Sequence, residues 1–191
     1  MKKSLTVLLL SVVFMTSISC KNKPMNNIDI KEEVIIYFSH SGNTKAVAEH
    51  LFEYSENFTG IFEIATKEPY SNEMDEVLAR GRDEFENNLR PELKEYNIDI
   101  NSIDTIYLGF PVWFSSVPMA VLTFLESHDF SGITIIPFST RGGGVIGESV
   151  DRIRNAAPNA KVLDGFHEIN RANYSNANEL LENWFNNFTE K

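Results

Sequence analysis

Five apolar, strand-like runs alternate with segments of helical periodicity along most of this chain of 191 residues. The runs are rich in β-branched and aromatic residues and lie at 34–39, 60–66, 104–113, 132–140 and 160–166. Helical patterns follow them at 47–54, 72–88, 117–126, 147–155 and 177–188. Near-continuous apolar runs are typical of strands buried on both faces, so the pattern predicts a parallel sheet with helices on either side. Because five strands are too few for an eight-stranded barrel, we expect one α/β domain over residues 33–191, an open three-layer sandwich.

The first twenty residues have the composition of a signal peptide. Two lysines precede an apolar run, and small residues stand just before Cys20, the sole cysteine. Such a segment is too short for a transmembrane helix and is typical of a secretory signal. The ending SISC resembles a bacterial lipoprotein signal, although Ser17 replaces the usual aliphatic residue, and a plain signal peptide is the alternative. We therefore expect an exported protein, periplasmic or envelope-attached through a lipid on Cys20, with residues 21–32 as a polar tether.

The charge and the reactive residues argue against several functions. Without Lys2 and Lys3, the chain has 15 basic and 27 acidic residues, which gives a net charge near −12. Nucleic acid is not an expected partner, because binding it needs a basic surface. The four histidines lack the spacing of metal ligands, and the nucleophile pattern G-x-S-x-G is absent. If Cys20 carries lipid, no thiol remains for disulfides or catalysis.

Three chemically unusual loops are predicted to follow strands of the sheet. They span residues 39–44, 111–116 and 140–144, with the sequences SHSGNT, PVWFSS and TRGGG. In open parallel sheets, ligands bind beyond the carboxyl ends of the strands. We therefore expect the three loops to form one binding site.

The first loop has the composition of an anion site. Small hydroxylated residues and Gly42, placed between a strand and a helix, leave backbone N–H groups unpaired with the helix dipole behind them. The hydroxyls of Ser39, Ser41 and Thr44 can also donate. Because the pattern G-x-x-x-x-G-K-[ST] is absent, a phosphate monoester fits better than a nucleoside triphosphate with magnesium. The alternative is a plain connector in which Ser39 caps the helix.

The second loop places two aromatic residues, Trp113 and Phe114, at the end of a buried strand. An aromatic pair at the mouth of a sheet can offer a flat surface to a planar ligand. The alternative is that both side chains pack under the helix that begins near Val117, and for Phe114 we expect this packing.

The third loop contains a G-x-G-x-x-G pattern at Gly142, Gly144 and Gly147. In dinucleotide-binding folds this motif follows the first strand, whereas here a single strand remains after it. We expect instead a glycine-rich backbone that approaches the edge of a ring and donates N–H groups to it. Arg141 either lies near that ring or is an ordinary surface arginine.

Together the three loops resemble those of the short-chain flavodoxins, over about residues 33–190. The matching patterns are S-x-S-G-N-T, G-x-P-x-W and T-x-G-G-G. The resemblance implies noncovalent FMN binding on a five-stranded parallel sheet of order 2-1-3-4-5. It implies that the phosphate is held by Ser39, His40, Ser41, Gly42, Asn43 and Thr44, with the backbone of His40 contributing more than its imidazole. It places the flavin ring between Pro111, Val112, Trp113 and Phe114 on one side and Thr140, Arg141, Gly142, Gly143 and Gly144 on the other.

The sequence shows no nicotinamide site, so an electron carrier is favoured, and two alternatives stay open. Electron-carrier flavodoxins usually cover the ring with an aromatic residue of the third loop, and TRGGG has none. One ring face would then be open to substrate, as in an FMN-dependent NAD(P)H:quinone-type oxidoreductase, unless Tyr70 or Phe85 of the insertion at 67–95 covers it. The other alternative is a flavin-free binding module at the envelope. The redox partner, whether a protein or a small-molecule acceptor, is not identified by the sequence.

Overall fold

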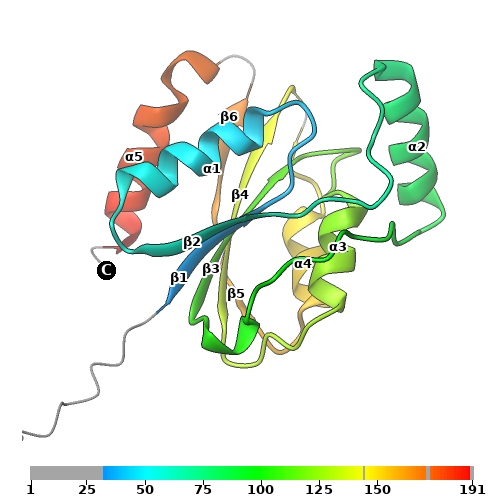
Figure 1. Ribbon diagram of the computed structural model, residues 1–191. Helices are drawn as coiled ribbons and strands as arrows, with labels where there is room; N and C mark the ends of the chain where they lie inside the picture. The colour runs from blue at the N-terminus through cyan, green and yellow to red at the C-terminus, as the bar shows by residue number, and fades with distance from the viewer. Residues whose placement is uncertain (1–31, 144, 171–172, 190–191) are drawn as a thin grey trace, which may run out of the picture. The chain divides into compact units, whose positions relative to one another are not determined.

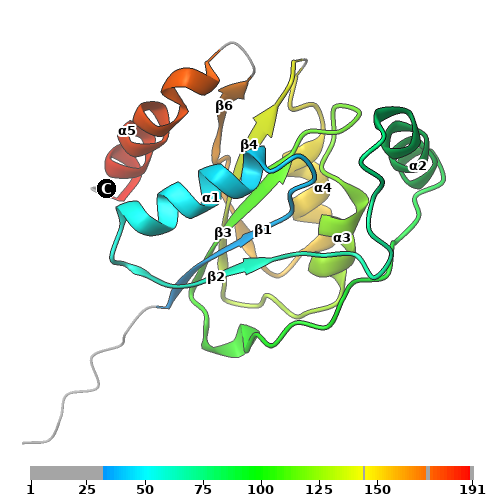
Figure 2. The ribbon, with the colours of Figure 1, turned by 45° about the horizontal axis from the view of Figure 1, so that its top comes forward.

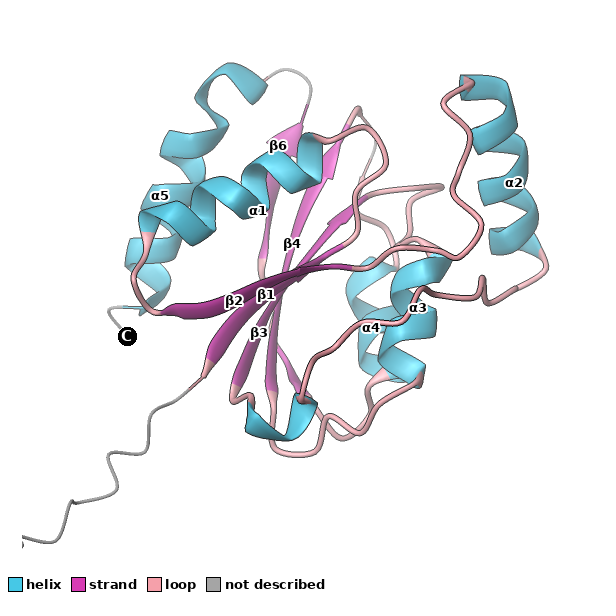
Figure 3. Cartoon of the chain, viewed as in Figure 1, coloured by secondary structure: helices cyan, strands magenta, loops and turns pink. Residues whose placement is uncertain are grey.

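A computed structural model describes residues 32–143, 145–170 and 173–189 of the chain. The predicted signal peptide with Cys20 lies outside these residues, as does the predicted tether apart from Glu32. In the described part, a parallel sheet carries helices on both faces (Figures 1 and 3).

The sheet has the predicted strand order. The strands β1 (Glu33–Tyr37), β2 (Phe58–Glu63), β3 (Thr105–Pro111) and β4 (Thr134–Arg141) run parallel in the order β2-β1-β3-β4. Two short strands, β5 (Lys161–Val162) and β6 (Phe166–Asn170), pair in parallel with successive parts of β4. The order 2-1-3-4-5 is therefore confirmed. The fifth strand differs from the prediction, because it is interrupted and continues to Asn170.

The interruption has a physical cause in Pro137 of β4. Ile135, two residues earlier, accepts a hydrogen bond from Leu163 N at 2.9 Å, so this side of β4 faces the fifth strand. Successive residues of a strand present their backbone groups to alternate neighbours, and Pro137 therefore faces the fifth strand too. Because proline has no N–H to donate, the ladder is broken there and pairing resumes where Phe138 faces Phe166.

Successive side chains of each strand point to opposite faces of the sheet, so they pack into two separate cores. On one face, Ile35 and Tyr37 pack with α1 (Asn43–Tyr54) and α5 (Ala177–Thr189). On the other face, Val34 and Ile36 pack with α3 (Met119–Glu126) and α4 (Ser149–Ala156). Figure 2 shows the two helical layers on opposite sides of the sheet. The predicted three-layer sandwich is confirmed.

The helix α2 (Met74–Glu86) does not cover the sheet. It lies beyond α3, on the α3 side of the sheet, in Figures 1 and 2. Its buried residues, Val77, Gly81 and Glu84, include only one large apolar side chain. The chain then returns through a short 3-10 helix (Ile100–Ser102) to β3. No helix within the described ranges has the length and apolar character needed to cross a membrane.

Candidate functional site

The three predicted loops meet at the carboxyl edge of the sheet, and Thr140 joins them. Its hydroxyl lies 2.9 Å from the Thr44 hydroxyl of the first loop. Its carbonyl oxygen accepts a hydrogen bond of 2.9 Å from Val112 N of the second loop. The structure therefore brings the first, second and third loops together, as the sequence predicted.

The first loop presents the uncapped N-terminus of α1. Gly42 occupies the N-cap position with φ 86°, in the left-handed region, and no side chain caps the helix. The first backbone hydrogen bond of the helix runs from Ala46 N to Gly42 O at 2.9 Å. The preceding N–H groups, from Gly42 to Lys45, have no partner within the helix. The alternative in which Ser39 caps the helix is wrong, and the loop has the form of an anion site.

Ser39 adds a hydroxyl group to this N-terminus. Its Oγ is buried and has no hydrogen-bond partner among the described residues. A buried hydroxyl without a partner is unfavourable, so its presence at an uncapped helix end indicates a ligand. The other loop hydroxyls have partners: Thr44 contacts Thr140, and Ser41 Oγ accepts from Asn43 Nδ2 at 3.1 Å.

Trp113 of the second loop belongs to a cluster of aromatic side chains. Its ring centroid lies 5.6 Å from that of Phe38 and 5.1 Å from that of Tyr70, with both pairs edge to face. The imidazole of His40 is 6.0 Å from Trp113 and 6.3 Å from Tyr70. The prediction gave His40 a role through its backbone, and the structure shows that its side chain also borders this cluster.

Tyr70 is held in place by a partly buried ion pair of α2. Its hydroxyl donates to Glu84 Oε2 at 2.6 Å, and the Arg80 guanidinium lies 4.1 Å from its ring centroid. Arg80 Nε donates to Glu84 Oε1 at 2.8 Å. Burial, followed by the hydrogen bond to Glu84, raises the pKa of Tyr70. The phenol therefore stays protonated and supports one edge of Trp113.

A tight turn, which no sequence pattern indicated, shapes the second loop. Trp113 and Ser116 exchange backbone hydrogen bonds of 2.9 and 2.8 Å, while Phe114 and Ser115 have φ values of 51° and 55°. Positive φ is rare for bulky residues and requires support from the surroundings. Ser115 O accepts from Glu148 N at 3.2 Å, and Gly147 packs so closely on this oxygen that a side chain there would overlap it.

Phe114 and Phe85 form a second contact between this loop and α2. Their rings lie 6.0 Å apart, and Arg82 lies 5.3 Å from the Phe114 ring. Phe114 was expected under the helix at 117–126, but these contacts place it against α2. Of the two aromatic residues predicted as ring covers, Tyr70 thus packs on Trp113 and Phe85 on Phe114.

The third loop begins where β4 ends. Thr140 is buried, Arg141 is half-buried, and Gly142 and Gly143 are exposed. Gly144 lies outside the described residues. The exposed Gly142 and Gly143 leave the backbone beside Thr140 open, and its approach to the edge of a ring stays a prediction.

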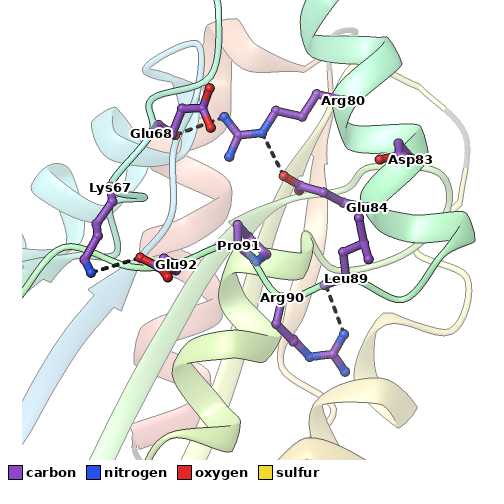
Figure 4. Close-up of a pocket in the computed structure, with 9 residues that line it drawn as sticks. All are labelled: Lys67, Glu68, Arg80, Asp83, Glu84, Leu89, Arg90, Pro91 and Glu92. Carbon is purple, nitrogen blue, oxygen red and sulfur yellow. Dashed lines mark hydrogen bonds and ion pairs between the residues drawn. The ribbon is translucent and has the colours of Figure 1, made fainter.

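Two cavities lie near α2. An apolar one of about 250 Å³ adjoins the first and second loops. A larger one of about 590 Å³ is lined by charged residues (Figure 4). Its basic side chains are already paired within 2.9 Å of acidic ones, in the pairs Lys67–Glu92, Arg80–Glu84 and Arg90–Glu126. The larger cavity therefore offers no free cation to an anionic ligand.

In the described ranges, no three His, Cys, Asp or Glu side chains are grouped as a metal site.

Comparisons with known proteins agree with this arrangement. The flavodoxin family model matches residues 32–188. A candidate flavoprotein of Bacteroides uniformis is 27% identical with a TM-score of 0.68, over 80% of this chain and 98% of that one. A candidate flavoprotein of Bacteroides eggerthii is 25% identical with a TM-score of 0.67, over 81% and 96%. A Lactobacillus acidophilus flavoprotein solved in complex with FMN shares the fold at 23% identity and a TM-score of 0.61, over 78% and 98%. No curated protein matches.

Proposed function

Because this chain belongs to the flavodoxin family, we propose that it binds FMN noncovalently at the three loops and carries electrons through it. The observation that supports this most directly is the uncapped N-terminus of α1 beside the buried, unpartnered hydroxyl of Ser39. Both features leave hydrogen-bond donors available to an anion, and FMN carries a monoester phosphate. The residues present therefore fit the cofactor.

Each loop has a distinct role in this proposal. The N–H groups of Gly42 to Lys45 and the Ser39 hydroxyl hold the phosphate, whose charge the helix dipole favours. Trp113, fixed by Phe38 and Tyr70, lies against the flavin ring. When bound, FMN supplies the one- and two-electron chemistry, while the protein sets position and surroundings.

The acidic surface supports a protein as the redox partner. The formal net charge of the chain is −10, and α2 has Asp75 and Glu76 in its first turn. An excess of negative charge speeds the encounter with a basic partner, and this acceleration becomes smaller as the ionic strength rises. We therefore propose a basic partner protein.

The second candidate function is that of an FMN-dependent reductase of small molecules, and the composition of the third loop favours it. The loop from Thr140 to Gly147 contains no aromatic residue, so it cannot supply a second stacking ring. An uncovered ring face would be accessible to a small acceptor. Carrier and reductase differ in whether NADH or NADPH bleaches the bound flavin without a partner protein, and for a carrier we expect no bleaching.

The deciding experiment is a titration of FMN into the full-length chain, followed by flavin absorption and fluorescence. We expect a shifted visible band, quenched fluorescence and a Kd of about 1 μM or lower. Trp113→Ala should weaken binding, whereas Trp184→Ala should not, because Trp184 packs on Phe166 in the opposite core. Absence of binding to the unmodified chain would overturn the proposal.

We also propose that the protein acts outside the cytoplasm, attached to the cell envelope through a lipid on Cys20. The support is the composition of residues 1–20 alone. Cell fractionation and palmitate labelling test this, with Cys20→Ala as the control. Label retained by that variant would contradict the assignment.

A further inference from the structure

The helix α2 shares the apolar cavity of about 250 Å³ with two loops of the proposed cofactor site. Most of the residues that line this cavity are ones already assigned to FMN, namely His40, Ser41, Pro111, Val112, Trp113 and Phe114. The other wall consists of three apolar residues of α2, Met74, Val77 and Leu78. The cavity therefore belongs to the cofactor site, and α2 borders the space that the cofactor would occupy.

Two of the α2 side chains at this cavity are exposed although they are large and apolar. Met74 is 66% exposed and Leu78 is 47% exposed, on a helix that is otherwise mostly polar. They lie on one face of the helix, because residues four apart are neighbours there. After them, Gly81 packs so closely that an added Cβ would lie 3.3 Å from Trp113 Cε3. Gly81 thus fixes the helix against the second loop and leaves Met74 and Leu78 exposed beside the cavity, as side chains that contact a ligand would be.

The lining suits the ring of a flavin and not its phosphate. The residues around the cavity include no acid, lysine or arginine, so a phosphate there would lose its hydration without a counter-ion. A flat aromatic ring, in contrast, packs well against apolar and aromatic side chains. The volume is below the range of about 300–1,000 Å³ that is typical for whole ligands, so the cavity has room for part of the cofactor. Because His40 and Ser41 also belong to the phosphate loop, a ring in the cavity would lie next to a phosphate held at α1.

We propose that Met74 and Leu78 of α2 cover the face of the flavin ring that is turned away from the second loop. This inference rests on the proposed FMN function and adds α2 to its three loops. Tyr70 and Phe85, the aromatic residues expected as ring covers, pack on the second loop itself. Two apolar side chains of the same insertion take that role. A ring covered on this face leaves less room for a small acceptor, which favours the carrier over the reductase.

Thiol labelling of α2 tests the cover directly. Leu78→Cys in a Cys20→Ala background gives the full-length chain one thiol, because Cys20 is its sole cysteine. Saturating FMN should slow the reaction of this thiol with a maleimide by about tenfold or more, since the reaction needs an accessible thiol. Leu89→Cys in the same background is the matched control, because Leu89 is 44% exposed and lines the charged cavity. Its labelling rate should change by less than about twofold with FMN.

Leu78→Gln shows whether the contact is made to the ring. It should weaken FMN and riboflavin by the same factor, about fivefold, because both flavins carry the ring and the variant replaces an apolar contact with a polar amide. Leucine and glutamine have similar helix propensities, so α2 should be retained. Leu89→Gln should change neither affinity. A loss confined to FMN, or equal losses in the two variants, would overturn the proposal.

Titration of the unmodified chain with FMN comes first and separates the two levels of the proposal. Absence of binding there would overturn the proposed function and this inference with it. Binding of FMN without protection of the thiol at position 78 would overturn the assignment of α2 alone. The two failures are therefore distinguishable.

Discussion

Thr44 Oγ1 and Thr140 Oγ1 lie 2.9 Å apart, and each threonine is only 1% exposed. One residue belongs to the first turn of α1 and the other to the end of β4, 96 residues later. The contact joins the phosphate loop to the glycine-rich loop at a point that water does not reach. It therefore fixes the distance between the two loops that the proposed cofactor bridges.

The contribution of this hydroxyl pair is measurable by a double-mutant cycle. Thr44→Val and Thr140→Val each leave the other hydroxyl buried without its partner, so each should lower the free energy of unfolding by about 1–3 kcal/mol. The double variant should lose less than the sum of the single losses, because no unpaired hydroxyl remains. Urea unfolding provides the measurement. Strictly additive losses would contradict a direct bond.

Ser39→Ala separates phosphate binding from ring binding. We expect FMN affinity to fall by about fivefold to tenfold, because one hydrogen bond to a charged group is lost. Affinity for riboflavin, which lacks the phosphate, should stay the same. The free energy of unfolding of the FMN-free variant should not fall, since the hydroxyl has no partner among the described residues. Equal losses for both flavins would contradict the assignment of Ser39 to the phosphate.

Gly147→Ala tests the support of the second loop. The new methyl group would overlap Ser115 O, and φ at this position is 58°. Gly132→Ala is the control, because φ there is 83° and no atom lies within 4 Å of the added Cβ. The control should cost about 1–2 kcal/mol for the left-handed backbone, and Gly147→Ala should cost more and also weaken FMN binding. Urea unfolding and flavin titration give the two results, and equal costs with unchanged FMN affinity would contradict the prediction.

We expect the stability of the fold to depend on pH through His167. Its Nε2 donates to Asp164 O at 2.6 Å, and in the neutral imidazole Nδ1 then accepts from the Ser139 hydroxyl, which lies 2.9 Å away. Burial, with the charge of Arg141 adding to it, lowers the pKa of His167 below its ordinary value of 6.5.

As pH falls below 6.5, the unfolded chain binds this proton before the folded protein does. The stabilisation is therefore complete above this pH and is lost as pH falls through the lowered pKa. Urea midpoints measured between about pH 7.5 and 5 should decline, and His167→Gln should decline less. The same decline in both proteins would show that other groups are responsible.

The sheet and the first loop were predictable from the sequence because their signals are local. Continuous apolar runs and a hydroxyl- and glycine-rich loop before a helix each reflect interactions between near neighbours, and the strand order and the uncapped α1 agree with them. The direction of the His40 side chain was not predictable. It depends on Tyr70 and Trp113, which are brought to it by tertiary packing.

The contacts of α2 were not predictable from sequence patterns either, because they also depend on tertiary packing. Its periodicity marks it as a polar helix, but its position depends on Gly81 fitting against Trp113 and Phe114. The glycine in the middle of the helix, which lowers intrinsic helix stability, was the available signal of that close packing. Likewise, the turn at Phe114 and Ser115 requires Gly147, more than thirty residues later in the sequence.

The proline in β4 also affects how the molecule meets other copies of itself. Because Pro137 breaks the pairing, the outer strand at that edge consists of pieces of two and five residues. A strand of another molecule that paired with this edge would meet no long, regular row of backbone donors and acceptors. Breaks of this kind protect sheet edges from strand-to-strand aggregation. A missing N–H group inside the sheet thus contributes to keeping neighbouring molecules apart.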